Sequence, residues 1–169
     1  MSENSTVENE LPLTNIITPS RVVVGLQAGS KKRLLEELAE LLANAGRVID
    51  KATVFRGLLD RERLGSTVLG QGVALPHTRI SDLEQPIGAL IILDTPIYFE
   101  ETEEVQIACA LLVPAESSDD YLKLVAKLAE LFSESSFREA LLAAPDSLHA
   151  HTLLNLPVDD TPRDPVDGP

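Results

Sequence analysis

Hydrophobic residues recur every three or four positions in five stretches of the chain, which is the spacing that gathers them on one face of an α-helix. Ser30 and Asp50 stand immediately before the first two stretches and can cap helices there, and Gly46 is expected to end the first helix. Asp119 or Asp120 can cap the third helix in the same way. The predicted helices cover residues 31–46, 51–63, 121–132, 135–144 and 146–155.

The same spacing predicts which side chains of these helices face the core. For the second helix the inward residues are expected to be Val54, Phe55, Leu58 and Leu59. For the third helix the expected stripe is Leu122, Val125, Leu128 and Leu131.

The remaining hydrophobic runs lack helical spacing and predict β-strands. Pro86–Leu93 and Val105–Val113 are continuous apolar runs apart from Gln106, which is typical of strands buried on both faces of a sheet. Residues 94–96 are expected to form a turn, followed by a short edge element at 97–100. The other predicted strands are Arg21–Gln27 and 72–75. Strands in the middle of the chain with helices before and after them predict an α/β fold, a three-layer α/β/α single domain whose mixed β-sheet is flanked by helices.

The length of 169 residues suits one domain, which we expect over residues 11–155. Residues 1–10 are polar and acidic and are predicted to form a flexible N-terminus. Residues 156–169 are rich in proline and aspartate and are predicted to form a disordered tail.

The net charge of −13 argues against binding to nucleic acid, whose phosphate backbone such a surface repels, and against docking on anionic membranes. No apolar stretch is long enough to cross a bilayer, and the N-terminus is not typical of a signal peptide, so we expect no membrane insertion and a cytoplasmic location. The single cysteine, Cys109, excludes an internal disulfide and lies in an apolar run, where a buried inert thiol is expected.

Candidate chemistry centres on His77, one of three histidines in the chain. Pro76 fixes φ and lacks a backbone donor, so the preceding strand is expected to stop there and to present His77 at a strand end. Strand ends that face loops are where α/β domains usually place their chemistry. An imidazole at such a position can act as a nucleophile, although a lone histidine can also be purely structural.

The residues before this histidine carry groups suited to phosphate. Gly70 and Gly72 allow tight turns and close approach by a phosphate, and Ser66 and Thr67 supply hydroxyl donors. Arg61, near the end of the second predicted helix, can pair with a phosphate as a fork. Together these groups are the parts of a phosphoryl-transfer site. The alternative interpretation is an ordinary turn beside a solvated arginine.

Two other patterns do not predict sites. His149 and His151 lie two positions apart on a helix and point to different faces, and no cluster of carboxylates or thiols accompanies them, so no metal site is expected. Ser66 lacks the strand–turn–helix elbow of serine hydrolases and is not expected to be a nucleophile. We expect no cofactor.

The run LLDRERLGSTVLGQGVALPHTRI at residues 58–80 resembles the active-site signature of the mannitol/fructose-type enzyme IIA proteins of the phosphoenolpyruvate-dependent phosphotransferase system. The similarity is greatest to the nitrogen-regulatory branch, whose pattern is close to L-x-R-E-x-x-G-S-T-x-x-G-x-G-x-A-x-P-H. Residues Ala110–Ala115 and Leu128–Ala144 also resemble the family's later strand and helices, so the resemblance covers about Leu11 to Leu154.

The resemblance implies that His77 takes phosphate on Nε2 from a histidine of an HPr-like carrier protein, with Arg61 beside it and Gly70 to Gly72 in the loop before it. It also implies a three-layer α/β/α fold. In the nitrogen-regulatory branch the phosphorylation state is a signal, so the implied partners are regulated targets such as transporters or sensor kinases, in nitrogen, carbon or potassium regulation.

One position departs from the family pattern. Tyr121 stands where the family usually carries a second histidine. A phenol can donate a hydrogen bond to phosphate but stays neutral at pH 7, so it cannot add the positive charge of a protonated imidazole. We therefore expect phosphorylation of His77 to survive but to be slower. The alternative is a protein-binding regulator with the same fold that is not phosphorylated.

Overall fold

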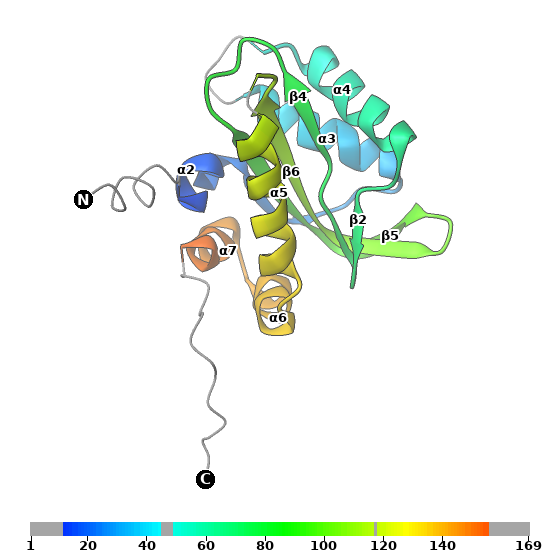
Figure 1. Ribbon diagram of the computed structural model, residues 1–169. Helices are drawn as coiled ribbons and strands as arrows, with labels where there is room; N and C mark the ends of the chain where they lie inside the picture. Colours follow the sequence, from blue (N-terminus) through cyan, green and yellow to red (C-terminus); the bar gives the residue numbers. More distant parts are fainter. Residues whose placement is uncertain (1–11, 45–48, 117, 156–169) are drawn as a thin grey trace, which may run out of the picture.

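A mixed β-sheet lies between two layers of helices in the computed structural model, which describes residues 12–44, 49–116 and 118–155 (Figure 1). Six strands form the sheet within these residues, in the order β1-β5-β6-β3-β2, and β4 also pairs with β6. The strands are β1 (Val22–Leu26), β2 (Val68–Gly70), β3 (Val73–Ala74), β4 (His77–Ile80), β5 (Ile87–Glu100) and β6 (Glu103–Pro114). The helices are α2 (Leu13–Ile16), the 3-10 helix η1 (Pro19–Arg21), α3 (Lys31–Ala43), α4 (Lys51–Leu64), α5 (Ser118–Phe132), α6 (Ser135–Ala143) and α7 (Ser147–Leu154). The predicted α/β/α architecture is confirmed.

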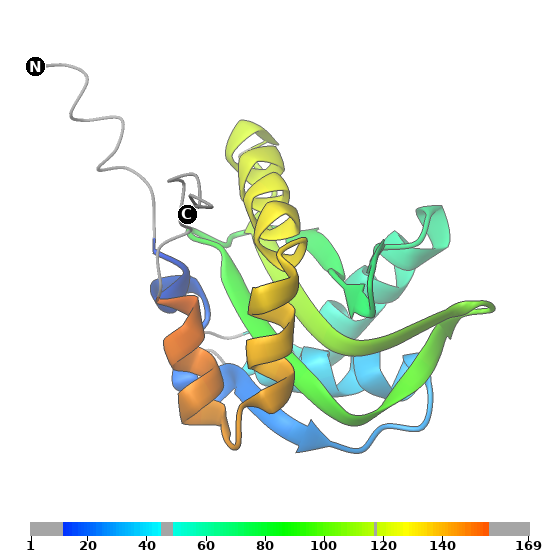
Figure 2. The same cartoon turned by 90° about the horizontal axis from the view of Figure 1, so that it is seen from below.

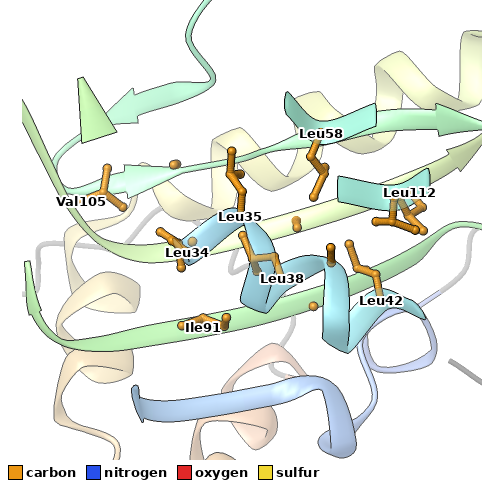
Figure 3. Packing of buried hydrophobic residues seen from close by; sticks show 14 of the residues in the cluster. Leu34, Leu35, Leu38, Leu42, Leu58, Ile91, Val105 and Leu112 are labelled. Carbon is orange, nitrogen blue, oxygen red and sulfur yellow. The ribbon is translucent and has the colours of Figure 1, made fainter. Parts of the chain in front are cut away.

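Helices α3 and α4 cover one face of the sheet, and α2, α5, α6 and α7 cover the other (Figure 2). The two long strands β5 and β6 serve both cores by alternation. Ile91 and Leu112 belong to the same cluster as Leu34, under α3 and α4 (Figure 3), whereas Leu90 and Leu111 belong to the opposite cluster. Burial on both faces therefore explains why these two segments are almost entirely apolar.

The predicted caps of the first two long helices are present. The Ser30 hydroxyl accepts a hydrogen bond from the backbone N–H of Arg33 at 3.1 Å, and the Asp50 carboxylate accepts one from that of Thr53 at 3.1 Å. On α4, the inward residues are those that the spacing predicted. Val54 and Leu58 are fully buried, and Phe55 and Leu59 pack against the same cluster.

Helix α5 departs from the prediction at its start. It begins at Ser118, so Asp119 and Asp120 lie inside the helix and are not its caps. Leu122, predicted to face the core, is 61% exposed. At about 100° per residue it lies roughly 120° around the helix from Leu128, whereas Tyr121 lies within about 20° of that buried residue. The helix therefore turns Tyr121, not Leu122, toward the sheet.

The predicted turn at 94–96 is wrong, because β5 continues through these residues as one strand to Glu100. The pairing with β6 shifts register between Ile92 and Ile97, which is how an irregularity absorbs a proline inside a strand. The predicted edge element at 97–100 is the end of this same strand, paired with β6.

The first predicted helix is shorter than expected, since α3 ends at Ala43. Gly46, the predicted flexible segment 1–10 and the predicted tail 156–169 lie outside the described residues. Within the described part of the chain, no helix has the length and apolar character needed to cross a membrane.

Candidate functional site

Strands β3 and β4 form one interrupted line along β6. Both pair with β6 in parallel and in the same register, with Ala74 opposite Ala108 and His77 opposite Leu111. Between them, Pro76 has no N–H to donate, although its carbonyl accepts a hydrogen bond from the Leu111 N–H at 2.9 Å. The pairing with β6 is therefore interrupted at Pro76 and continues from His77. The sequence-based prediction that the strand ends at the proline is wrong in this respect. His77 is the first residue of the resumed strand β4.

The hydrogen bond of the His77 ring fixes which nitrogen carries the proton. The side chain is buried, and Nδ1 lies 2.6 Å from the carbonyl oxygen of Leu75. A carbonyl oxygen can only accept, so Nδ1 must be protonated and donate to it. In the neutral ring, Nε2 then holds the lone pair and is the nucleophilic atom.

The surroundings of His77 keep its ring neutral at pH 7. Burial lowers the pKa of His77 below its ordinary value of 6.5, because water no longer solvates the charged form. The hydrogen bond to Leu75 raises this pKa, the positive charge of Arg61 lowers it, and the negative charge of Glu62 raises it, but the net shift is downward.

Arg61 lies in the last turn of α4, where its guanidinium donates a hydrogen bond to the Gly65 carbonyl at 2.9 Å. One turn earlier, Gly57 brings this helix close to β4. A Cβ at Gly57 would lie 3.1 Å from two atoms of the Thr78 side chain. The missing side chain thus sets how near α4, and with it Arg61, lies to the strand that carries His77.

A buried carboxylate, which the sequence analysis missed, joins α4 to the following loop. Glu62 accepts hydrogen bonds from the hydroxyl and the backbone N–H of Thr67. Lys31 pairs with Glu62 at 3.3 Å and with Glu100 at 2.9 Å. Glu62 lies one turn after Leu58, on the buried face of the helix, and an acidic residue at that spacing was the signal that could have identified it.

The two predicted hydroxyl donors have different positions. Ser66 is exposed, and its hydroxyl accepts a hydrogen bond from the Val68 N–H at 3.2 Å. Thr67 is buried, its hydroxyl is engaged by Glu62, and its carbonyl accepts from the Leu75 N–H at 2.9 Å. Thr67 therefore anchors the loop against the strand before His77, and only Ser66 has its side chain at the surface.

Gly70 and Gly72 lie apart from His77. They flank the turn between β2 and β3, where Gly70, Gln71 and Gly72 have φ of 98°, 58° and 82°. Gly72 is five residues before His77, about 16 Å along an extended strand. Gln71 and Gly72 line a depression of about 230 Å³ that Pro96 also lines, and His77 does not contribute to it. The structure does not bring these glycines to the imidazole.

Tyr121 reaches the imidazole from α5. The ring centroids of His77 and Tyr121 are 5.6 Å apart, and the ring planes are tilted by 50°. The guanidinium carbon of Arg79 lies 4.6 Å from the centroid of the same Tyr121 ring. Arg79 is a second residue that the sequence analysis missed, although its place two positions after His77 on a strand puts it on the same face.

The other two histidines form hydrogen bonds away from His77, and the cysteine is buried. His149 Nδ1 is 2.7 Å from an Asp146 carboxylate oxygen, and His151 Nε2 is 2.8 Å from the Ile17 carbonyl oxygen. Burial raises the pKa of the Cys109 thiol to about 12, which makes it inert as a nucleophile. The described residues contain no group of three histidine, cysteine or acidic side chains placed to hold a metal ion.

Comparison with known proteins identifies the family. Residues 15–156 match the family described as phosphoenolpyruvate-dependent sugar phosphotransferase system, EIIA 2. The nitrogen regulatory protein of Pseudomonas aeruginosa is 38% identical, over 79% of this chain and 88% of that protein. The crystal structure of nitrogen regulatory protein IIA-Ntr from Neisseria meningitidis matches with a TM-score of 0.78 and 37% identity, over 84% of this chain and 98% of that one. The crystal structure of mannitol IIA from Escherichia coli shares the fold, with a TM-score of 0.68 and 20% identity, over 80% of this chain and 96% of that one. The chain therefore belongs to the EIIA 2 family of the phosphoenolpyruvate-dependent sugar phosphotransferase system.

Proposed function

We propose that this chain is a regulatory phosphoryl carrier that accepts a phosphoryl group on Nε2 of His77 and signals through its phosphorylation state. The observation that carries the proposal is the 2.6 Å hydrogen bond between His77 Nδ1 and the Leu75 carbonyl oxygen, because it leaves the lone pair on Nε2. Family membership supports it, since two similar relatives are nitrogen regulatory proteins.

The donor in this proposal is a phosphohistidine of an HPr-like carrier protein. The Nε2 lone pair attacks the phosphorus atom, an N–P bond to His77 forms, and the donor's N–P bond breaks with its electron pair returning to the donor's nitrogen. His77 keeps the proton on Nδ1, and the donor ring keeps the proton on its other nitrogen. One N–P bond replaces another, so transfer runs in both directions, as a carrier requires.

The electrostatics of the site suit this step. The lowered pKa of His77, caused chiefly by burial, keeps the nucleophile uncharged at neutral pH. Arg61, whose charge already acts on the imidazole, can leave the Gly65 carbonyl and pair with the phosphoryl oxygens, where charge develops during transfer.

The signal is a change of charge on a partly apolar surface. Leu64, at the end of α4, is 84% exposed, and Leu122, next to Tyr121, is 61% exposed. A phosphoryl group on His77 adds about −1.5 to −2 charges to the site that Arg61 of α4 and Tyr121 of α5 border. A partner that buries these leucines would then gain or lose affinity. The proposed partners are the HPr-like donor and regulated targets such as transporters or sensor kinases, and the proposed location of this chain is the cytoplasm.

The test is phosphorylation of the full chain by phosphoenolpyruvate, the first enzyme of the relay and an HPr-like donor, followed by intact mass before and after acid treatment. We expect an acid-labile gain of one phosphoryl group. His77→Ala should abolish it, and the matched control His149→Ala should retain it, because His149 is an exposed histidine on α7. A gain that survives in His77→Ala would contradict the proposal.

The second candidate is a binding regulator that is not phosphorylated. Two observations favour it: His77 is only 6% exposed, and the ring beside it is the phenol of Tyr121, which cannot carry a positive charge. It predicts no mass gain with any competent donor and equal partner binding by wild type and His77→Ala.

A further inference from the structure

Tyr121 contacts two side chains of β4. Its ring centroid is 5.6 Å from that of His77 and 4.6 Å from the guanidinium carbon of Arg79. Alternate residues of a strand share a face, so His77 and Arg79 both point toward the α5 layer. Thr78 points the other way, to Gly57 of α4. One aromatic ring thus contacts both the imidazole and a guanidinium.

We propose that Arg79, stacked on Tyr121, supplies the positive charge for the phosphoryl group on His77 that a protonated histidine at position 121 would otherwise supply. This inference rests on the proposed function and adds to it a positioning pair. A phenol cannot carry a positive charge, but the face of its ring attracts a guanidinium. The tyrosine therefore contributes charge to the site through the arginine that it holds.

The direction of the His77 ring supports this role. Nδ1 points to the carbonyl of Leu75, two residues earlier on the same face. Because the two ring nitrogens point in widely different directions, Nε2 is directed away from Leu75. Arg79 is the next residue on that face in the other direction along the strand.

The charges around the site explain why a second cation is useful. The chain carries a net charge of −13, and phosphorylation adds more negative charge. Arg61 acts on His77 from the end of α4, on the other side of the sheet from α5. Arg61 therefore lies on the α4 side of the sheet, whereas the Arg79 side chain lies on the α5 side against Tyr121. A planar guanidinium can hydrogen-bond two phosphoryl oxygens at once.

The test compares transfer rates to His77 from two donors, the HPr-like phosphoprotein and the small molecule phosphoramidate, whose P–N bond breaks with release of ammonia. Phosphoramidate needs no protein docking, so it reports on the phosphoryl group alone. We expect Arg79→Gln to lower both rates about tenfold and Arg79→Lys to restore part of the loss. Tyr121→Phe should keep most of the rate because the ring remains, whereas Tyr121→Leu should lose it. Arg63→Gln is the matched control, since Arg63 is an exposed arginine paired with Asp60.

The outcomes distinguish failure of the inference about Arg79 from failure of the proposed function. Equal rates for wild type and Arg79→Gln would overturn the inference and leave the proposed function intact. A loss seen only with the phosphoprotein would also overturn it, by assigning Arg79 to donor docking. A wild type that neither donor phosphorylates would overturn the proposed function itself. Additive losses in the Arg79→Gln/Tyr121→Leu double variant would contradict the pairing, because residues that act together lose less than the sum.

Discussion

Gly57 of α4 and Thr78 of β4 are in such close contact that a Cβ on the glycine would lie 3.1 Å from both the hydroxyl oxygen and the methyl carbon of the threonine. This contact fixes the distance between the helix that carries Arg61 and the strand that begins at His77. The first prediction concerns this distance.

Gly57→Ala should slow phosphoryl transfer several-fold while changing the free energy of unfolding by less than about 1 kcal/mol, because the gain in helix propensity offsets the crowding. The slowing follows because a few tenths of an ångström between α4 and β4 moves Arg61 away from the phosphoryl group. Transfer kinetics and denaturant unfolding measure the two quantities. Gly29→Ala, where nothing lies within 4 Å, should change neither. An unchanged transfer rate in Gly57→Ala would show that the spacing does not matter.

Gly88 marks a second close approach, and its replacement should affect stability. A Cβ at Gly88 would lie 2.7 Å from a side-chain carbon of Ile17, and the Gly88 carbonyl accepts a hydrogen bond from buried Arg21 at 2.9 Å. We expect Gly88→Ala to lower the free energy of unfolding by about 1–3 kcal/mol through overpacking. Urea denaturation measures the change, again against Gly29→Ala, and equal midpoints for the two variants would refute the expectation.

The buried pair of Thr67 and Glu62 gives a third prediction. Thr67→Val keeps the side-chain shape but removes the hydroxyl donor to the Glu62 carboxylate. We expect a loss of about 1–3 kcal/mol in the free energy of unfolding, because a buried carboxylate loses a partner. The same substitution at exposed Thr95, also in a strand, should cost much less, and a similar cost at both sites would count against the role given to Glu62.

The pH dependence of His77 follows from its lowered pKa, which burial chiefly causes. The neutral ring is the nucleophile, so the transfer rate should stay level as the pH falls through 6.5, the ordinary value, and decline only below it. Stability should start to fall earlier on acidification, as the pH drops from 6.5 toward the lower pKa of the folded chain, because the unfolded chain takes up a proton on this histidine before the folded chain does. NMR titration of the His77 ring measures the pKa directly. A midpoint at or above 6.5 would be incompatible with the buried, neutral ring.

The proposal that Arg79 replaces the positive charge of a histidine at position 121 can be tested by restoring that histidine in a variant that lacks Arg79. If Arg79 replaces the charge of a histidine, then Tyr121→His in the Arg79→Gln background should recover much of the lost phosphoryl transfer below the pKa of the new imidazole. Transfer from phosphoramidate at pH 6 and pH 8 measures this, with recovery expected at the lower pH only. A double variant as slow as Arg79→Gln at both values would argue that the two positions do not share one task.

The sequence predicted those parts of the fold whose signals are local. Ser30 and Asp50 each sit three residues before the N–H that they cap, so the pattern could be recognised without the fold. The two long buried strands followed from runs that are almost entirely apolar. The failures depend on strand pairing, which no single segment of the sequence shows. Pairing with β6 carries β5 through the predicted turn at 94–96, and pairing with β6 makes His77–Ile80 a strand after the proline.

The residues of the candidate site also divide into those that a local motif predicts and those that only the fold brings together. His77 and Arg61 came from one short motif, and the structure places them within electrostatic reach of each other. Gly70 and Gly72 belong to that motif as well, but the extended strand between them and His77 keeps them apart. Arg79 could not be assigned from the sequence, because its contact is with Tyr121, 42 positions later and in another layer of the fold.

Three consecutive residues, Leu75, Pro76 and His77, determine the tautomer of the nucleophilic imidazole. Among the described residues, the Leu75 carbonyl accepts its hydrogen bond from His77, at the point where the proline interrupts the ladder. The hydrogen bond that makes Nε2 the reactive nitrogen therefore lies within one tripeptide and involves no residue of the helices. Because this hydrogen bond is local, a change at a neighbouring position does not alter the tautomer. The side chain at position 121 can therefore be a phenol instead of an imidazole while Nε2 of His77 stays the nucleophilic atom.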